Sequence, residues 1–142
     1  MKLIILGEPK PKQSAKFAKI GKFMRSYQPK EVVRNENNMR SQVVSQLPEG
    51  FVPFQKAVAV KKLHYVFPLL KSMNKKTLTA IQFGKMVYKT TKPDVTDNLS
   101  KSLFDALNGI VFADDSLIVS MDNVKKYYGM QPRIELEIEE LE

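Results

Sequence analysis

The aspartates of this chain are confined to one short part of the sequence. Residues 92–115 contain Asp94, Asp97, Asp105, Asp114 and Asp115, and the remaining one, Asp122, follows closely. Crowded carboxylates repel one another unless a cation or hydrogen-bond donors offset their charge. Three carboxylates that face one point would suit Mg²⁺, which usually takes one or two carboxylates together with water and phosphate oxygens. We therefore interpret residues 92–115 as the candidate active site.

Other kinds of reactive centre are poorly supported. The chain has no cysteine and one histidine, His64, so thiol chemistry and zinc sites rich in cysteine or imidazole cannot be built. A Ser-His-Asp triad would depend on His64 alone. This residue lies in a predicted strand, where we expect it to have a structural role.

The residues around the first two aspartates predict how they are positioned. Pro93 disfavours a helix before it, so Asp94 is expected in a turn or at the end of an extended segment. Apolar residues then recur at helical spacing. Thr96 or Asp97 is the expected N-cap, and the sequence Asn-Gly at 108–109 predicts the end of the helix.

The same spacing predicts which side chains share a surface. Asp97, Lys101 and Asp105 fall four residues apart, on the face opposite the leucines. Residues 116–121 alternate as in a strand, so a helix, turn and strand could bring the Asp114–Asp115 pair back towards the start of the helix.

Each of these motifs also has an ordinary structural explanation. A Thr-Asp sequence before a helix commonly serves as a cap, and Asp97 with Lys101 could form a surface ion pair. An Asp-Asp sequence before a strand is common in turns. The confinement of all the motifs to one stretch favours a functional site.

Length and composition predict a single globular domain over residues 1–142. The hydrophobic content of 43% and charged content of 27% are typical of globular proteins. The apolar run at residues 3–6 is too short for a signal peptide, and no later run could span a bilayer. Together with the absence of cysteine, this predicts a cytoplasmic protein without membrane association.

Hydrophobic periodicity predicts both strands and helices along the chain. The expected strands are residues 2–7, a hairpin over 14–20 and 22–27, a central strand at 57–67, a strand at 116–121 continued by 121–128, and a strand at 133–138. The expected helices are residues 31–47, a short one within 78–83, and the one in the aspartate stretch.

The net charge of +8 is unevenly distributed. Residues 1–93 contain 19 lysines and arginines against four acids, whereas residues 94–142 contain four basic residues against 11 acids. A basic body around an acidic cluster suits a protein that binds nucleic acid beside a metal-dependent centre. Anionic lipid is the rival polyanion, but no basic amphipathic helix supports it. The candidate DNA contacts are Lys10, Lys12, Lys16, Lys22, Arg25, Lys75, Lys76, Lys89 and Lys92.

Two explanations remain open for the predicted hairpin at residues 14–27. Phe17, Phe23 and Tyr27 alternate there with lysines and an arginine. Such rings could stack on exposed bases while the cations contact phosphates. Alternatively, the hairpin is half buried and its basic face is solvated.

Several motifs resemble the signature of the RusA family of Holliday junction resolvases. They are Lys92-Pro93-Asp94, Asp97-Asn98-Leu99 with Lys101, Asp105-Ala106-Leu107-Asn108-Gly109, and Asp114-Asp115-Ser116. The similarity extends to Gly7-Glu8-Pro9, Tyr27-Gln28-Pro29, the lysine-rich segment at 71–92, and Lys126-Tyr127-Tyr128-Gly129. One departure is that the first two aspartates lie three residues apart, where the family usually has two.

This resemblance implies a homodimer with an α/β (α+β) fold, in which a small mixed β-sheet is flanked by helices. It also implies an endonuclease that uses Mg²⁺, with Mn²⁺ as a substitute, to cut branched four-way DNA junctions symmetrically during recombination and repair. Family members often occur in phages and prophages. The resemblance implies Asp94, Asp97, Lys101 and Asp115 as catalytic residues, the three aspartates as metal ligands, and Asp114 as a reserve ligand.

Two other classes of function are consistent with the residues alone. In a non-catalytic DNA-binding or architectural protein, the aspartates would only cap helices and form ion pairs. In an interaction module, the basic face would bind an acidic protein partner.

Overall fold

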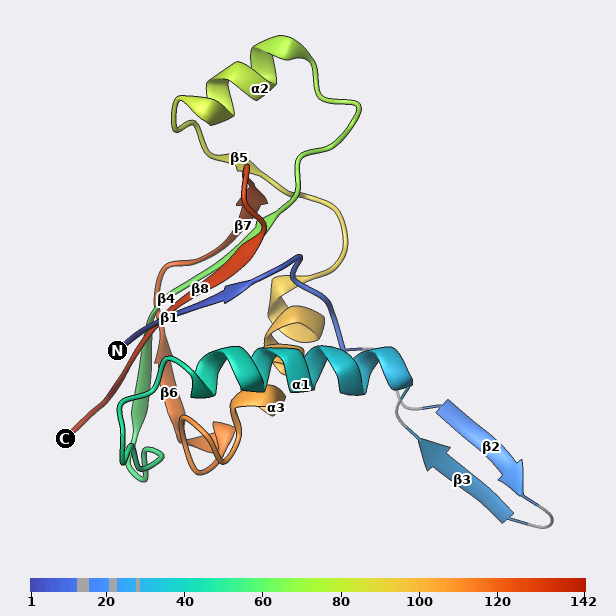
Figure 1. Cartoon of the computed structure of the whole chain (residues 1–142), viewed down its shortest axis with the longest axis vertical. Helices are drawn as coiled ribbons and strands as arrows, with labels where there is room; N and C mark the ends of the chain where they lie inside the picture. Colours follow the sequence, from blue (N-terminus) through green and yellow to red (C-terminus); the bar gives the residue numbers. More distant parts are fainter. Residues whose placement is uncertain (13–15, 21–22, 28) are drawn as a thin grey trace.

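The structure is a computed structural model that describes the backbone of residues 1–12, 16–20, 23–27 and 29–142, and the side chains of residues 1–12 and 29–142. Its main feature is a mixed six-stranded sheet in the order β1-β8-β4-β7-β5, with β6 paired to β4. The expected fold class, a small mixed sheet flanked by helices, is confirmed (Figure 1). The strands are β1 (Lys2–Leu6), β4 (Val58–Phe67), β5 (Val87–Tyr88), β6 (Ile118–Met121), β7 (Val124–Tyr128) and β8 (Arg133–Glu140).

Strand β4 is the centre of this sheet, as its valine and aromatic content predicts. It runs antiparallel to β8 on one side. On the other side it pairs in parallel first with β6, along its initial residues, and then with β7, along its final ones. Tyr65 and Val66 are fully buried, as are most other residues of the strand. Strand β4 is therefore the hydrophobic centre of the sheet, and both ends of the candidate site at residues 92–115 are attached to it.

Two helices supply most of the remaining core. In α1 (Lys30–Val44) the buried residues include Met39 and Val43, and in α3 (Ser100–Leu107) they include Leu103 and Leu107. All four side chains belong to the same hydrophobic cluster as β1, β4 and β8. The spacing of these residues is that of one helical face, so the helices bury their apolar stripes against the sheet.

Two elements lie away from this core. The helix α2 (Lys75–Gln82) leads into β5 at one end of the sheet, and the antiparallel hairpin of β2 (Lys16–Ile20) and β3 (Phe23–Tyr27) extends beyond the amino end of α1 (Figure 1). The predicted hairpin is thus confirmed in its backbone. Its aromatic and basic side chains lie outside the described residues.

Several predicted boundaries were wrong. The expected strand over 116–128 is divided into β6 and β7, because Asn123 adopts a left-handed conformation with φ 51°. Helix α1 ends at Val44 rather than at residue 47. Within the described ranges, no helix is long and apolar enough to cross a bilayer.

His64 has the structural role expected of it. The side chain is buried in β4, and its two ring nitrogens lie 2.9 Å from the Tyr127 hydroxyl and 3.1 Å from the Asn123 amide oxygen. Burial lowers the pKa of His64 and so favours the neutral ring, which both neighbours can satisfy. The histidine orients Asn123 at the bend between β6 and β7.

The exposed edge of β1 is covered by two glutamines, Gln42 in the last turn of α1 and Gln46 just beyond its end. The Gln46 side chain accepts from Ile4 N–H at 2.9 Å and donates to Ile4 C=O at 2.6 Å. Gln42 makes the same pair of bonds with Leu6, at 2.8 and 2.9 Å. These amides satisfy backbone groups that a neighbouring strand would otherwise pair, and they fix α1 against the sheet.

We expect the double substitution Gln42→Ala and Gln46→Ala to lower the free energy of unfolding by about 1–3 kcal/mol, because four hydrogen bonds are exchanged for bonds to water. Urea denaturation followed by circular dichroism measures this change. The matched control is Gln82→Ala at the exposed end of α2. Equal destabilisation by the double variant and the control would contradict a role for the glutamine pairs.

Candidate active site

Asp94 begins the helical segment that carries the candidate catalytic residues. Its carboxylate accepts hydrogen bonds from Asp97 N–H at 3.1 Å and Asn98 N–H at 2.8 Å. Asp94 is therefore the N-cap, and the predicted cap at Thr96 or Asp97 was wrong. Because the backbone N–H of Asp97 donates to one carboxylate oxygen of Asp94, the two exposed aspartates lie together at the start of the segment.

The first turn after this cap is a π-helix, η1 (Val95–Leu99), which continues into α3. Leu99 N–H donates to Asp94 C=O at 3.1 Å, and the Ser100 hydroxyl donates to Val95 C=O at 2.6 Å. A π-helical turn contains one more residue than an α-helical turn, so it accommodates the three-residue spacing between the two aspartates at the start of the helix.

The wide turn is fastened to the centre of the sheet. The hydroxyl of buried Tyr65 in β4 lies 3.2 Å from the Ser100 hydroxyl, which in turn bonds to Val95 C=O. Burial raises the pKa of Tyr65, so this hydroxyl stays protonated. A partly buried chain of hydrogen bonds thus connects the hydrophobic core to the backbone beside the exposed carboxylates.

Lys126 holds the loop that precedes Asp94. Its ammonium group in β7 donates to the carbonyl oxygens of Thr91 and Pro93, at 2.6 and 2.7 Å. The sequence did not reveal this role, because every residue has a backbone carbonyl group. The types of the side chains do not indicate which carbonyl oxygens accept a hydrogen bond from a lysine.

The exposed side of α3 differs from the expected arrangement of two acids and one base. Lys101 is exposed, one turn after Asp97, but Asp105 bonds to Lys12 at 2.7 Å. Lys12 also pairs with Glu36 of α1 at 3.1 Å. Burial opposes the charge of Lys12, yet its hydrogen bonds to Asp105 and Glu36 outweigh burial and raise its pKa.

Asp114 and Asp115 lie at the other end of α3. The segment after α3 pairs Phe112 with Phe54, and β6 then starts beside Val58 at the beginning of β4. Asp97 is near the opposite end of a continuous helix that extends about 15 Å to Leu107 at 1.5 Å per residue. Asp114 accepts from Ser116 N–H at 3.1 Å, and hydrogen bonds from Ser116 lower its pKa. Asp115 is exposed and begins a short 3₁₀ turn, η2 (Asp115–Leu117).

The expected meeting of three carboxylates is therefore not found within one chain. Across residues 1–12 and 29–142, no group of three or more histidine, aspartate or glutamate side chains is arranged to hold a metal ion. The structure brings Asp94 and Asp97 together with Lys101 nearby, and it places Asp114 and Asp115 elsewhere. One chain therefore has two separate pairs of carboxylates, Asp94 with Asp97 and Asp114 with Asp115.

The candidate DNA contacts are of three kinds. Lys10, Lys75, Lys76 and Lys92 are exposed, as expected. Lys12 and Lys89 instead have partners within the protein: the Lys12 side chain is only 17% exposed in its ion pairs, and Lys89 bonds to Thr91 at 2.9 Å and lies over the rings of Phe67 and Tyr128. Lys16, Lys22 and Arg25 have side chains outside the described residues.

Comparisons with known proteins identify the family of this chain. The chain is 39% identical over 80 residues to an uncharacterized protein of Bacillus subtilis (strain 168), YqaN; the match covers 56% of this chain and 54% of that protein, so it spans about half the length of this relative. The family described as "Endodeoxyribonuclease RusA" matches residues 7–139, which include both aspartate pairs, the wide turn and the five strands from β4 to β8 except the last residue of β8. Since this match extends over nearly the whole sequence, the chain belongs to the RusA endodeoxyribonuclease family.

Proposed function

We propose that this protein is a Mg²⁺-dependent endodeoxyribonuclease that resolves four-way DNA junctions by symmetric hydrolysis of two phosphodiesters. The observation that carries the proposal is the exposed pair Asp94 and Asp97, held at the start of η1 within a chain of the RusA family. Its setting would be recombination and repair of bacterial or phage DNA in the cytoplasm.

The side chains at η1 are suited to a hard cation. Asp94 uses one oxygen as a helix cap, which leaves its other oxygen available, and Asp97 forms no ion pair with another described residue. Two carboxylates are the number that Mg²⁺ commonly takes when water and phosphate oxygens complete its shell. When bound, Mg²⁺ lowers the pKa of coordinated water and offsets negative charge on the reacting phosphate.

The protein's own groups would then position and stabilise the reacting phosphodiester. Water attacks phosphorus, the bond from phosphorus to one ester oxygen breaks, and a proton passes to the departing oxygen. Lys101, exposed one turn after Asp97, would donate to the phosphate oxygens as negative charge develops. Tyr65 and Ser100 would act indirectly, by holding the backbone of η1 in place.

We further propose that a homodimer completes the centre. Asp115 lies at the far end of α3 from Asp97, so a second copy could supply its Asp115 to the Asp94–Asp97 pair of the first. By symmetry, each dimer would then have two equivalent centres, one for each strand to be cut. Each centre would use residues from both chains.

We expect Asp97→Asn to abolish Mg²⁺-dependent cleavage of a synthetic four-way junction while binding is kept or strengthened, because one negative charge beside phosphate is removed. Gel assays with and without Mg²⁺ measure cleavage and binding separately. Asp122→Asn, an exposed aspartate between β6 and β7, is the matched control. Normal cleavage by Asp97→Asn would refute the assignment, and binding without cleavage by the unaltered protein would favour an architectural role.

Lys101→Ala should reduce the single-turnover cleavage rate by about 100-fold or more, with little change in junction affinity, if the ammonium group acts mainly on the transition state. Lys56→Ala, at an exposed lysine outside the candidate DNA contacts, serves as a control for the loss of one positive charge. If the substitution at position 101 weakens binding as much as it slows cleavage, Lys101 is only a phosphate contact.

Mixing two inactive variants tests the shared centre. In a mixed dimer of Asp97→Asn and Asp115→Asn chains, a centre built from both copies leaves one site with both native aspartates and the other with neither. We therefore expect nicking of one strand to reappear on mixing. Random exchange of equal amounts makes about half of the dimers mixed, and each has one of its two centres intact, so about a quarter of the native number of sites should return. If each centre used a single chain, no activity would return.

A further inference from the structure

A cavity of about 380 Å³ lies between the end of β1 and the first half of α1. It is separate from the carboxylates of η1, and none of the expected functions assigns it a role. One side is the segment from Ile5 to Lys10, which leaves the sheet at Gly7, where φ is +114°. A second cavity of about 270 Å³ shares Lys10, Glu31 and Arg34 with it and extends to Pro11. Together they form a groove of the size that commonly holds small organic ligands.

The deep part of this groove is apolar. Ile5, Met39 and Ile134 line it, and all three are buried members of the hydrophobic core. They come from β1, α1 and β8, so the floor is part of the rigid body of the protein. Such a surface favours a flat or compact apolar group over a solvated ion.

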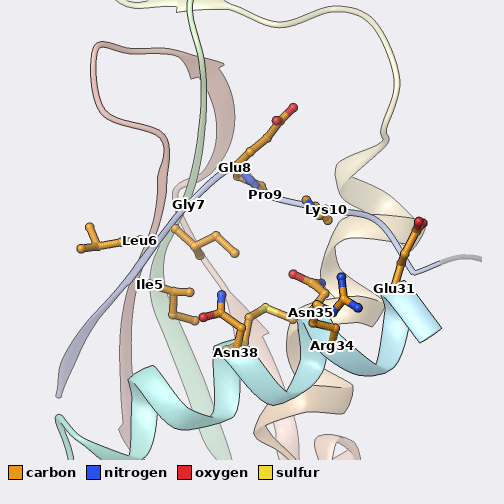
Figure 2. A pocket seen from close by; sticks show the side chains of 12 residues that line it. Ile5, Leu6, Gly7, Glu8, Pro9, Lys10, Glu31, Arg34, Asn35 and Asn38 are labelled. Atoms are coloured by element: carbon orange, nitrogen blue, oxygen red, sulfur yellow. The ribbon is translucent and has the colours of Figure 1, made fainter. Parts of the chain in front are cut away.

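Two amides of α1 form a polar edge above this floor. The Asn35 amide nitrogen donates to buried Ser102 at 3.3 Å, which leaves its oxygen to accept. The Asn38 oxygen accepts from Gln42 at 3.4 Å, which leaves its nitrogen to donate. Residues three apart lie on one face of a helix. Figure 2 shows both side chains directed from α1 towards the segment that contains Gly7 and Pro9.

Charged groups occupy the rim. Arg34 and Lys10 are exposed there, and Glu8 points away from the cavity (Figure 2). Glu31 lies at the outer end near Arg34. The groove therefore has the cations Arg34 and Lys10 at its entrance, which suit a phosphate. Inside, the neighbouring amides of Asn35 and Asn38 provide an acceptor and a donor, which suit a ring with hydrogen-bonding groups along one edge.

The groove ends close to the candidate catalytic residues. Lys12, two residues beyond Lys10, donates its backbone N–H to the carbonyl oxygen of Asn98 at 3.1 Å. Asn98 is the residue after Asp97. Two residues of extended chain span about 7 Å, which is the order of one or two nucleotide steps.

We propose that this groove binds one unpaired nucleobase of the DNA substrate, next to the phosphodiester that is cut. The base would contact Ile5 and Met39, its polar edge would pair with Asn35 and Asn38, and its phosphate would contact Lys10 and Arg34. The inference rests on the proposed nuclease function and deepens it, because bases can leave their stack at a branch point but not readily in continuous duplex. The groove would thus make cleavage depend on branched structure.

The test uses the Asp97→Asn protein, so that binding is measured without cleavage. Four-way junctions carry the fluorescent base 2-aminopurine at one position at a time around the branch point. We expect fluorescence to change on binding at one position in each of two opposing strands. Asn38→Ala should remove this change and raise the junction Kd about fivefold, the effect of about one lost hydrogen bond.

Asn37→Ala is the matched control, because Asn37 is exposed on α1 and does not line the groove. A junction with an abasic residue at the responding position should bind the Asn38→Ala and parent proteins equally, since the partner of the amide is gone. A fluorescence response that Asn38→Ala leaves unchanged, or a fivefold loss that persists on the abasic junction, would overturn the proposal.

The proposed function is judged separately, with the unaltered chain. If the unaltered chain cuts the junction in a Mg²⁺-dependent manner but no 2-aminopurine position responds, only the proposal that the groove binds a nucleobase is refuted. Failure of the unaltered chain to bind or cut the junction would refute both.

Discussion

The candidate site depends on the chain of hydrogen bonds that joins the middle of the sheet to the wide turn of η1. Tyr65 is fixed by the core, Ser100 links its hydroxyl to Val95 C=O, and Lys126 fixes the preceding loop from the neighbouring strand. Exposed carboxylates have little packing of their own to hold them. Their positions are therefore set by the partly buried polar contacts of Tyr65, Ser100 and Lys126, which are costly to leave unsatisfied.

The cluster of Lys12, Glu36 and Asp105 provides a second fixed point. It joins the segment after β1 to both α1 and α3, and Lys12 also bonds through its backbone to Asn98. The groove and the aspartate pair are consequently parts of one body. A substrate that spans both would meet a surface whose shape is already formed, which reduces the ordering cost of binding.

Sequence patterns predicted the fold more reliably than the site. The central strand, the hairpin, the end of α3 and the structural role of His64 were correct because they follow from burial and backbone preference. The N-cap was assigned to Thr96 or Asp97 because helical periodicity does not reveal a π-turn. Lys12 was expected to contact DNA, since its partners Glu36 and Asp105 are distant in sequence. The expected meeting of Asp94, Asp97 and Asp115 is not found within one chain for a similar reason. The length of the helix, rather than the type of residue, sets the distance between Asp97 and Asp115.

The glutamine pairs on β1 constrain how two copies can associate. Gln42 and Gln46 already occupy the hydrogen-bonding groups of Ile4 and Leu6 that face outward, so this edge has little left to offer an added strand. The opposite side ends in β5 and β6, which are two and four residues long. In the proposed dimer, side-chain surfaces rather than a continuous sheet would therefore have to join the two copies. The geometry of the two proposed centres would follow from how those surfaces fit.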